Sequence, residues 1–333
     1  MNKFPVAAMN SRREFIGRLG VAAGGFAVLS ATSGGCAQKP VNSPDQPVWL
    51  GMTQQELNDA YDQSVYASNI PEFFERLGAR SAASLQRLGK PEAYRYSDTP
   101  GGNLVVFGVA NAGAPVHVFI HGGTWRFGSA DLYYSIAENV VNAGASAVLL
   151  NFASVSEDAV PLGFLAGQIR DAVKWIYLNA DRFGGDPEQI YVSGHSSGGH
   201  LAGVALTTDW PGDYQLPADV IKGGVCCSGM FDLAPVRLSS RNDWLQLTDD
   251  EVRALSPQRH IEHLNAPLIV AYGTSETPEF QRQSRDFAAA VKASGKPVEL
   301  VVAEGYNHFE IVESCTDAQG VIGRVLLAQM GLA

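Results

Sequence analysis

Short runs of hydrophobic residues recur along the chain and alternate with longer segments whose apolar positions have helical spacing. The runs are rich in β-branched and aromatic residues and are bounded by glycine, proline or polar residues, which is typical of strands. Several are apolar at every position, as strands buried on both faces of a parallel sheet are. We therefore expect strands over 93–96, 103–109, 116–120, 147–150, 189–193, 223–227, 268–272 and 298–303.

The intervening segments predict helices. Residues 53–89 are mostly helical in pattern, and residues 161–183 carry one apolar stripe that stops at a Gly-Gly pair. A further helix is expected to begin with Thr277 as its cap and to stop at Gly295. The turn at 100–102 predicts that the first two strands form a hairpin. Eight strands alternating with helices indicate an α/β fold, a mostly parallel eight-stranded sheet with helices on both faces.

Composition and charge narrow the classes of function. The 333 residues are 46% hydrophobic and 17% charged, which is globular composition with ample length for one large α/β domain. A net charge of −10 argues against nucleic acid or anionic lipid as the main partner. No apolar run is long enough to predict a spanning helix. The cysteines and histidines have no zinc-binding spacing. We expect neither a metal nor an organic cofactor, because the serine chemistry described below needs none.

The first 36 residues have the pattern of an export signal. Ser11-Arg12-Arg13 resembles the start of a bacterial twin-arginine signal, and an apolar stretch and small residues follow it. Cys36 stands where a lipoprotein would be lipidated, whereas cleavage near Ala37 would leave no anchor. Residues 37–48 are expected to be a tether and 49–333 the catalytic domain. The sequence thus predicts a periplasmic protein, with a membrane anchor only if Cys36 is lipidated.

A Gly-x-Ser-x-Gly pattern centred on Ser196 lies between the predicted strand 189–193 and a helical segment. A serine on such a strand-to-helix turn presents its hydroxyl outward, and the small residues at Gly194 and Gly198 allow close backbone approach. Amides at the helix start can stabilise negative charge beside it. This context predicts that Ser196 is a catalytic nucleophile.

A serine hydroxyl needs a base and an orienting acid. His308 follows the last strand, at the sheet edge where Ser196 also lies, and is the predicted base. Two carboxylates follow the seventh strand, Glu276 and Glu279. Glu276 is preferred because it precedes the helix cap at Thr277, whereas an acidic residue in the first helical turn is expected in any case.

The third feature is a Gly-Gly pair after the third strand. The amides of Gly122 and Gly123, with that of Ser197, are predicted to form an oxyanion hole. Trp125, which closes this segment, could line the substrate pocket or could pack in the core. His195 and Phe152 are the other two residues that we expect to border the pocket.

Several of these motifs together resemble the bacterial kynurenine formamidase (arylformamidase) branch of the α/β hydrolases, which is close to the hormone-sensitive-lipase-like esterases. The resemblance spans roughly residues 50–315 and implies the α/β-hydrolase fold. It also implies the roles assigned above to the serine, acid, histidine and glycine loop. The chain departs from the family at Thr124, where an aromatic residue is usual, and at Ser197, where alanine is usual. The motifs are residues 121–125, 194–200, 208–210, 255–257 and 276–280.

The expected function is that of an exported serine hydrolase that cleaves a small ester, aryl amide or formamide through an acyl-enzyme. Its partner is then a small-molecule substrate. Three alternatives remain open from the sequence: kynurenine formamidase proper, a serine peptidase or amidase on the same fold, and a non-catalytic binding protein on a hydrolase scaffold.

Overall fold

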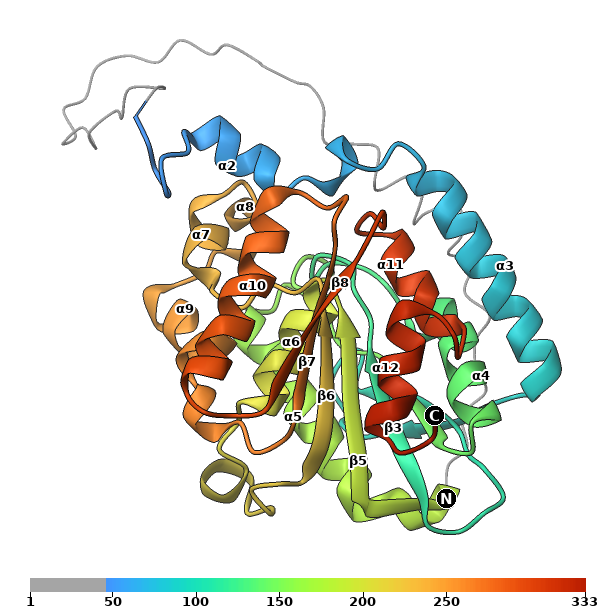
Figure 1. Ribbon diagram of the computed structural model, residues 1–333. Coiled ribbons are helices and arrows are strands. Elements are labelled where there is room, and N and C mark those ends of the chain that lie inside the picture. Colours follow the sequence, from blue (N-terminus) through green and yellow to red (C-terminus); the bar gives the residue numbers. More distant parts are fainter. Residues whose placement is uncertain (1–45) are drawn as a thin grey trace.

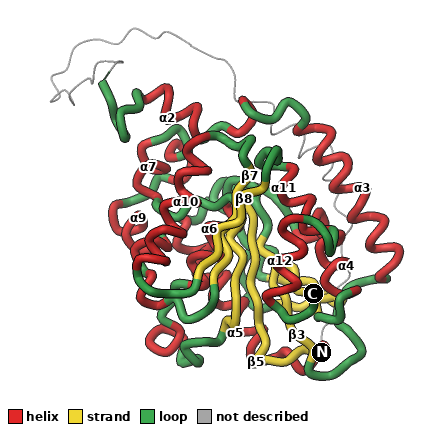
Figure 2. The backbone as a smooth tube through the Cα atoms, in the orientation of Figure 1, coloured by secondary structure: helices red, strands yellow, loops and turns green. Residues whose placement is uncertain are grey.

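The computed structural model describes residues 46–333. The predicted export signal with Cys36, and nearly all of the predicted tether, lie outside the described residues. One eight-stranded sheet runs through the described part, in the order β1-β2-β4-β3-β5-β6-β7-β8 (Figures 1 and 2). Its strands are β1 (Glu92–Arg95), β2 (Asn103–Phe107), β3 (Ala114–Ile120), β4 (Ser146–Leu150), β5 (Gly185–His195), β6 (Ile221–Cys227), β7 (Leu268–Gly273) and β8 (Val298–Ala303).

The sheet confirms the predicted fold class. β1 and β2 form the expected antiparallel hairpin, β2 pairs antiparallel with β4, and every other pairing is parallel. β5 begins four residues before its predicted start, because Gly185 pairs with Ala114 across an irregularity in register. The polar and turn-forming residues at 185–188 concealed this extension.

Helices cover both faces of the sheet, as predicted (Figure 1). The core cluster on one face includes side chains of α5, α6 and α10, and the cluster on the other includes side chains of α4 and α12. The described α-helices are α2 (Gln54–Ala60), α3 (Ile70–Leu88), α4 (Tyr134–Asn142), α5 (Leu162–Asn179), α6 (Ser197–Leu206), α7 (Leu233–Leu238), α8 (Asn242–Leu245), α9 (Asp249–Leu255), α10 (Pro278–Ala293), α11 (Glu310–Glu313) and α12 (Val321–Gln329). Single-turn segments are η1 (Gln63–Val65), η2 (Ala130–Tyr133), η3 (Ala180–Phe183), η4 (Trp210–Tyr214), η5 (Pro257–Arg259), η6 (Ile261–His263) and η7 (Ser314–Thr316).

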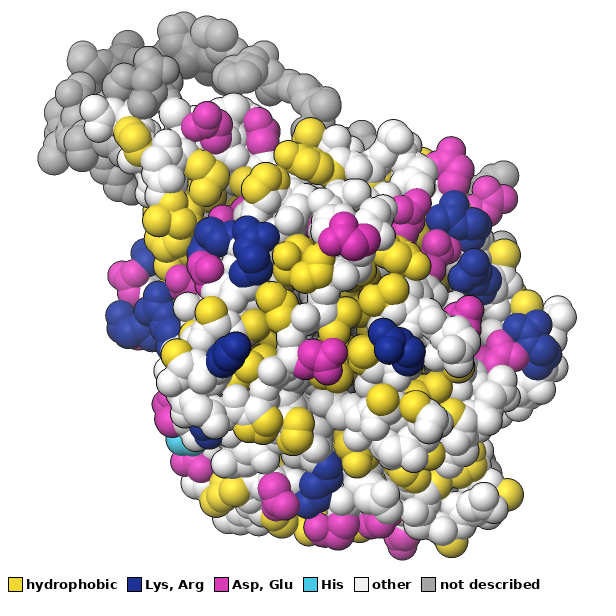
Figure 3. Space-filling view, viewed as in Figure 1, with side chains coloured by type: hydrophobic (Ala, Val, Ile, Leu, Met, Phe, Trp, Pro, Cys, Tyr) yellow, Lys and Arg dark blue, Asp and Glu magenta, His cyan; other side chains and the backbone are white. Residues whose placement is uncertain are grey.

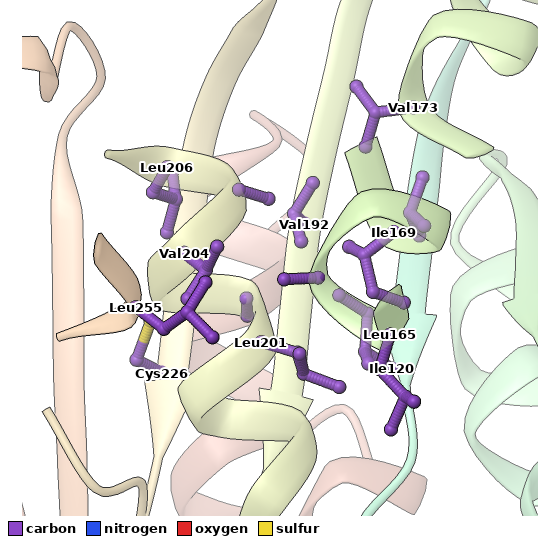
Figure 4. Close-up of a cluster of buried hydrophobic side chains, with 14 of the residues drawn as sticks. Ile120, Leu165, Ile169, Val173, Val192, Leu201, Val204, Leu206, Cys226 and Leu255 are labelled. Carbon is purple, nitrogen blue, oxygen red and sulfur yellow. The ribbon is translucent and has the colours of Figure 1, made fainter. Parts of the chain in front are cut away.

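Side chains on the two faces of each central strand belong to different hydrophobic clusters. In β4, Val148 and Leu150 belong to the cluster that packs against α5 and α6, whereas Ala147 and Leu149 belong to the opposite cluster. Figure 4 shows the first cluster between β5, α5 and α6, with Val192, Leu165 and Ile169 among its side chains. Burial on both faces explains why the strands are apolar throughout.

The segment 228–264 is polar and shows no periodic apolar pattern in its sequence, yet much of it is helical. It forms the three short helices α7, α8 and α9, and residues such as Leu233, Val236 and Leu255 are buried. Helices of four to seven residues are too short to show a periodic apolar stripe, so the pattern missed them.

The visible surface has no large region of positive charge. On the face shown in Figure 3, acidic and basic side chains are interspersed and no continuous basic surface is visible. Within residues 46–333, no helix is both long and apolar enough to cross a membrane. The same residues contain no cluster of three or more histidine, cysteine or acidic side chains that could hold a metal ion. Cys226 and Cys227 are buried in β6.

Candidate active site

Ser196 lies between the end of β5 and the start of α6, in a strained backbone conformation with φ 58° and ψ −124°. A non-glycine residue adopts positive φ at a cost, and the surrounding structure must impose it. Here the Ser196 amide donates to the carbonyl of Cys227 at the end of β6 (2.9 Å), and the Ser196 carbonyl accepts from His200 (3.0 Å). The turn is therefore fixed on both sides of the serine.

The two glycines that flank Ser196 in the motif are required because there is no room for a side chain at either position. A Cβ on Gly194 would come within 2.1 Å of the Gly198 carbonyl oxygen. A Cβ on Gly198 would come equally close, 2.1 Å, to the carbonyl oxygen of Ile120 in the adjacent β3. The sharp turn and its packing against β3 thus explain both glycines of the motif.

The structure brings Ser196, His308 and Glu276 into one hydrogen-bonded chain. His308 Nε2 lies 2.9 Å from Ser196 Oγ, and His308 Nδ1 lies 2.8 Å from Glu276 Oε2. Because an ionised carboxylate can only accept, Nδ1 carries the hydrogen and Nε2 accepts from the serine hydroxyl. The three residues follow β5, β8 and β7, whose parallel arrangement places their carboxyl ends at one edge of the sheet.

The Glu276 carboxylate is held from a second side. Its Oε1 accepts from the hydroxyl of Ser228 (2.6 Å) and from the amide of Gly273 (2.7 Å). Ser228 follows β6 and has φ 51°, so it too occupies a strained turn. These donors, with His308, give hydrogen-bond partners to both oxygens of a carboxylate that is only 1% exposed.

Glu279, the alternative acid, belongs to a separate network. Its carboxylate accepts from Arg282 at 2.5 and 2.8 Å and from the hydroxyl of Tyr61 at 3.2 Å. Thr277 occupies the N-cap position of α10, as predicted, but its hydroxyl donates to the carbonyl of Ala60 and not to the first turn of the helix. Glu276 is therefore the one of the two carboxylates that is bonded to His308.

The loop after β3 places Gly122 against the serine. A Cβ on Gly122 would lie 2.9 Å from the His195 carbonyl oxygen and 3.1 Å from Ser196 Cβ. Gly123 has φ 132°, and its carbonyl accepts from the amides of residues 126 and 127. In the described part of the chain, the amides of Gly122, Gly123 and Ser197 donate to no protein acceptor. Gly122 and Ser197 lie beside Ser196, and unused backbone donors next to a nucleophile are what an oxyanion site needs.

The residues expected to border the pocket occupy three different environments. Trp125 is 1% exposed, lies in the core and donates its indole N–H to His200 Nδ1 (3.2 Å). Phe152 is half-buried and stacks on His121, next to the glycine loop, with ring centres 4.3 Å apart. His195 is buried, and its Nε2 lies 2.7 Å from the main-chain oxygen of His308.

His195 supports the loop that carries the triad histidine. Because a carbonyl only accepts, His195 Nε2 carries the hydrogen of this bond. Burial, and to a smaller extent the nearby His308, lowers the pKa of His195 well below its usual range. A neutral His195 therefore adds no positive charge beside the triad.

Sequence reasoning missed Ser228 and the supporting role of His195. Ser228 follows the sixth strand, so its place at the carboxyl edge of a parallel sheet was a usable signal. A lone serine after a strand has many other roles, however, and only the packed fold shows its bond to Glu276.

Two family models match the chain. Residues 108–221 match the family described as BD-FAE, and residues 166–319 match the prolyl oligopeptidase family. Among curated proteins, the chain is 28% identical to a kynurenine formamidase of Danio rerio, over 85% of this chain and 98% of that protein. It is 30% identical to a kynurenine formamidase of Salmo salar, over 65% of this chain and 73% of that protein.

Solved structures share the fold. An esterase of Pyrobaculum calidifontis superposes with a TM-score of 0.63 at 19% identity, over 84% of this chain and 97% of that one. The fold, the site and these similarities define a hydrolase of the α/β-hydrolase fold. Within that class, the chain belongs to the kynurenine formamidase (arylformamidase) and hormone-sensitive-lipase-like carboxylesterase branch.

Proposed function

We propose that the protein is a serine hydrolase that cleaves small esters and aryl amides or formamides through an acyl-enzyme on Ser196. The observation that carries this proposal is the uninterrupted chain of hydrogen bonds from Ser196 through His308 to Glu276. A non-catalytic binding protein has no need to hold a serine at positive φ with a base 2.9 Å from its hydroxyl.

The geometry supplies a role for each group. His308 Nε2 accepts the Ser196 proton as Oγ attacks the substrate carbonyl, and Glu276 stabilises the imidazolium that forms. The amides of Gly122, Gly123 and Ser197 stabilise the developing oxyanion. His308 then protonates the leaving group, and water, activated by the same histidine, hydrolyses the acyl-enzyme.

The proposed class of substrate is based on the proteins to which the chain is similar. Two of the curated relatives are kynurenine formamidases, which favours an N-formylated aryl amine, while other curated relatives and the Pyrobaculum neighbour are esterases. A short acyl group such as formyl suits a serine that lies close under the Gly122 loop. We propose an aryl formamide as the preferred substrate, with small esters as further substrates.

Export is part of the proposal. The order of an Arg-Arg pair, an apolar stretch and small residues before Cys36 supports twin-arginine transport to the periplasm. Replacement of Arg12 and Arg13 by lysine should retain the protein in the cytoplasm on cell fractionation. Unchanged periplasmic recovery of that variant would contradict this part of the proposal.

A second candidate is a serine peptidase, because residues 166–319 match the prolyl oligopeptidase family. The same residues could attack a peptide carbonyl, so the substrate decides between the two candidates.

The deciding experiment is kcat/KM of the purified protein on N-formylkynurenine, a p-nitrophenyl ester and a peptide p-nitroanilide, measured side by side. The proposal predicts about 10⁴ M⁻¹s⁻¹ or more on the formamide, well above the other two substrates. Ester turnover with negligible formamide turnover would overturn the formamide preference. Preferential turnover of the peptide would favour the peptidase.

A further inference from the structure

Arg241, in the connection between α7 and α8, is a buried cation that is only partly satisfied. The residue is 6% exposed. One terminal guanidinium nitrogen donates to the main-chain oxygen of Tyr61 (2.6 Å). Its Nε and its other terminal nitrogen are buried and have no hydrogen-bond partner among the described residues. Those two nitrogens carry three unused N–H donors.

The surroundings of Arg241 are aromatic. The guanidinium carbon lies 5.7 Å from the ring centre of Tyr61 and 5.6 Å from that of Phe280. Among the described residues no carboxylate lies within ion-pair distance of Arg241: Asp62 acts on its charge only from farther away, and the nearby Glu279 is already paired with Arg282. Burial lowers the pKa of Arg241 to about 10, so the side chain stays charged at neutral pH.

An unpaired buried charge costs free energy and is expected to have a counter-ion in at least one functional state. Arg282 shows the usual solution in the same part of the fold, with two carboxylates bound to one guanidinium. Arg241 has no such partner, although its unused donors would accommodate one. The geometry therefore leaves donors on Arg241 that could bind an anion from outside the described residues.

The position of Arg241 links this anion to the active site. The ring of Phe280 stands edge-on to the ring of His308, with ring centres 4.9 Å apart. Arg241 lies against the same Phe280 ring, so its guanidinium is separated from the triad histidine by one aromatic ring. A substrate with its scissile carbonyl on Ser196 could place a second group near Arg241.

We propose that Arg241 binds a carboxylate of the substrate, so that the enzyme selects aryl amides or esters that carry a negative charge away from the scissile bond. This inference rests on the proposed function. It assigns the anionic group to the leaving portion, because a formyl group has no room for a charge. Guanidinium donors bind carboxylates more strongly than neutral groups, which makes charge the basis of selection.

The test compares two formamides that differ only in the carboxylate, N-formylkynurenine and its decarboxylated counterpart, N-formylkynuramine. We expect wild-type kcat/KM to favour the acid by about 10- to 100-fold. In Arg241→Met the ratio should fall to near one, and in Arg241→Lys it should be intermediate. Arg282→Met is the matched control, because its lost partner is Glu279, and its ratio should equal that of the wild type.

A second readout does not depend on turnover. Calorimetric binding of kynurenine and kynuramine to Ser196→Ala should show the same preference for the carboxylate, and adding Arg241→Met should remove it. No preference in the wild type, or an unchanged ratio in folded Arg241→Met, would overturn the inference. If the wild type cleaves neither formamide, the proposed function fails, whereas the binding preference still tests Arg241.

Discussion

Two carboxylates three residues apart have different partners in this fold, and their partners define their roles. Glu276 is bonded to His308, Ser228 and the Gly273 amide, all around the triad. Glu279 is bonded to Arg282 within α10 and to Tyr61 at the end of α2. The side chain of Glu279 is therefore a structural link between helices.

This difference predicts opposite effects of two matched substitutions. In Glu276→Gln, donors from Ser228 and Gly273 hold the amide oxygen, so the amide nitrogen faces His308 Nδ1 and disfavours the productive tautomer. We expect kcat on an ester to fall by about 10⁴-fold. Glu279→Gln should leave kcat within about threefold but lower the free energy of unfolding by about 1–3 kcal/mol. The reverse pattern in kinetics and thermal melts would contradict the assignment.

His195 is predicted to be a positioning residue for His308. His195→Ala removes the donor to the His308 carbonyl, and the freed loop should lower kcat by about 10- to 100-fold with little change in KM. His117→Asn is the control, because His117 is a buried strand histidine bonded to Ser193 and not to the triad. It should lower stability and leave kcat nearly unchanged. A large rise in KM for His195→Ala would instead indicate direct substrate contact.

At this scale the sequence placed Ser196, Glu276 and His308 at the points that the structure joins by hydrogen bonds. The context of the motif and the order of the strands were enough to predict the triad, because they determine which loops lie at the same edge of the sheet. Arg241 could not be predicted in this way. Its burial against Tyr61 and Phe280 depends on how α7, α2 and α10 pack, which no local pattern reports.

At the scale of elements, the strand-to-helix turn at Ser196 depends on glycines that permit close contact between neighbouring strands. A residue with a side chain at 198 would collide with main-chain oxygens of Ile120 and His121. The turn, and with it the placement of Ser196 beside the Gly122 loop, is therefore set by packing as well as by local conformation.

Gly198→Ala is expected to lower both stability and activity. The added methyl group would sit 2.1 Å from the Ile120 oxygen, so β3 or the turn must shift. We expect a loss of about 2–4 kcal/mol in the free energy of unfolding and at least about a 100-fold loss in kcat/KM. Gly167→Ala, in open space within α5, is the control and should be neutral or stabilising by about 0.5–1 kcal/mol. Equal effects of the two substitutions would contradict this account.

Helices and strands could be predicted from the sequence where their burial produces a regular spacing of apolar residues. The central strands and the helix at 162–179 have apolar residues at the spacing that their packing requires. The helices α7, α8 and α9 were missed because each buries only a few isolated side chains. Their stability comes from tertiary contacts, which the sequence does not display.

At the scale of the whole molecule, several histidines are buried and neutral. Burial lowers the pKa of His117 to about 3 and of His121 and His200 to about 4. An exposed histidine in the unfolded chain titrates near 6.5. Below that pH the unfolded state binds protons that the folded state does not, so stability is greatest above about pH 6.5 and falls as pH falls toward about 4.

Urea unfolding at several pH values tests this dependence. Each buried histidine should contribute about 1.4 kcal/mol of lost stability per pH unit between about pH 6 and pH 5, a range in which most carboxylates do not titrate. His200→Asn should reduce the slope by one histidine's share. A free energy of unfolding that stays constant from about pH 7 to about pH 5 would contradict the burial of neutral histidines.

The central claim is that Ser196 is the nucleophile of a hydrolase, and covalent labelling tests it most directly. The wild-type protein, treated with a serine-directed fluorophosphonate and analysed by peptide mass spectrometry, should carry the label on Ser196. Ser196→Ala should melt at a similar temperature, remain unlabelled and have no hydrolase activity. An unlabelled, inactive wild type, or a Ser196→Ala variant that still labels and turns over substrate, would contradict the account.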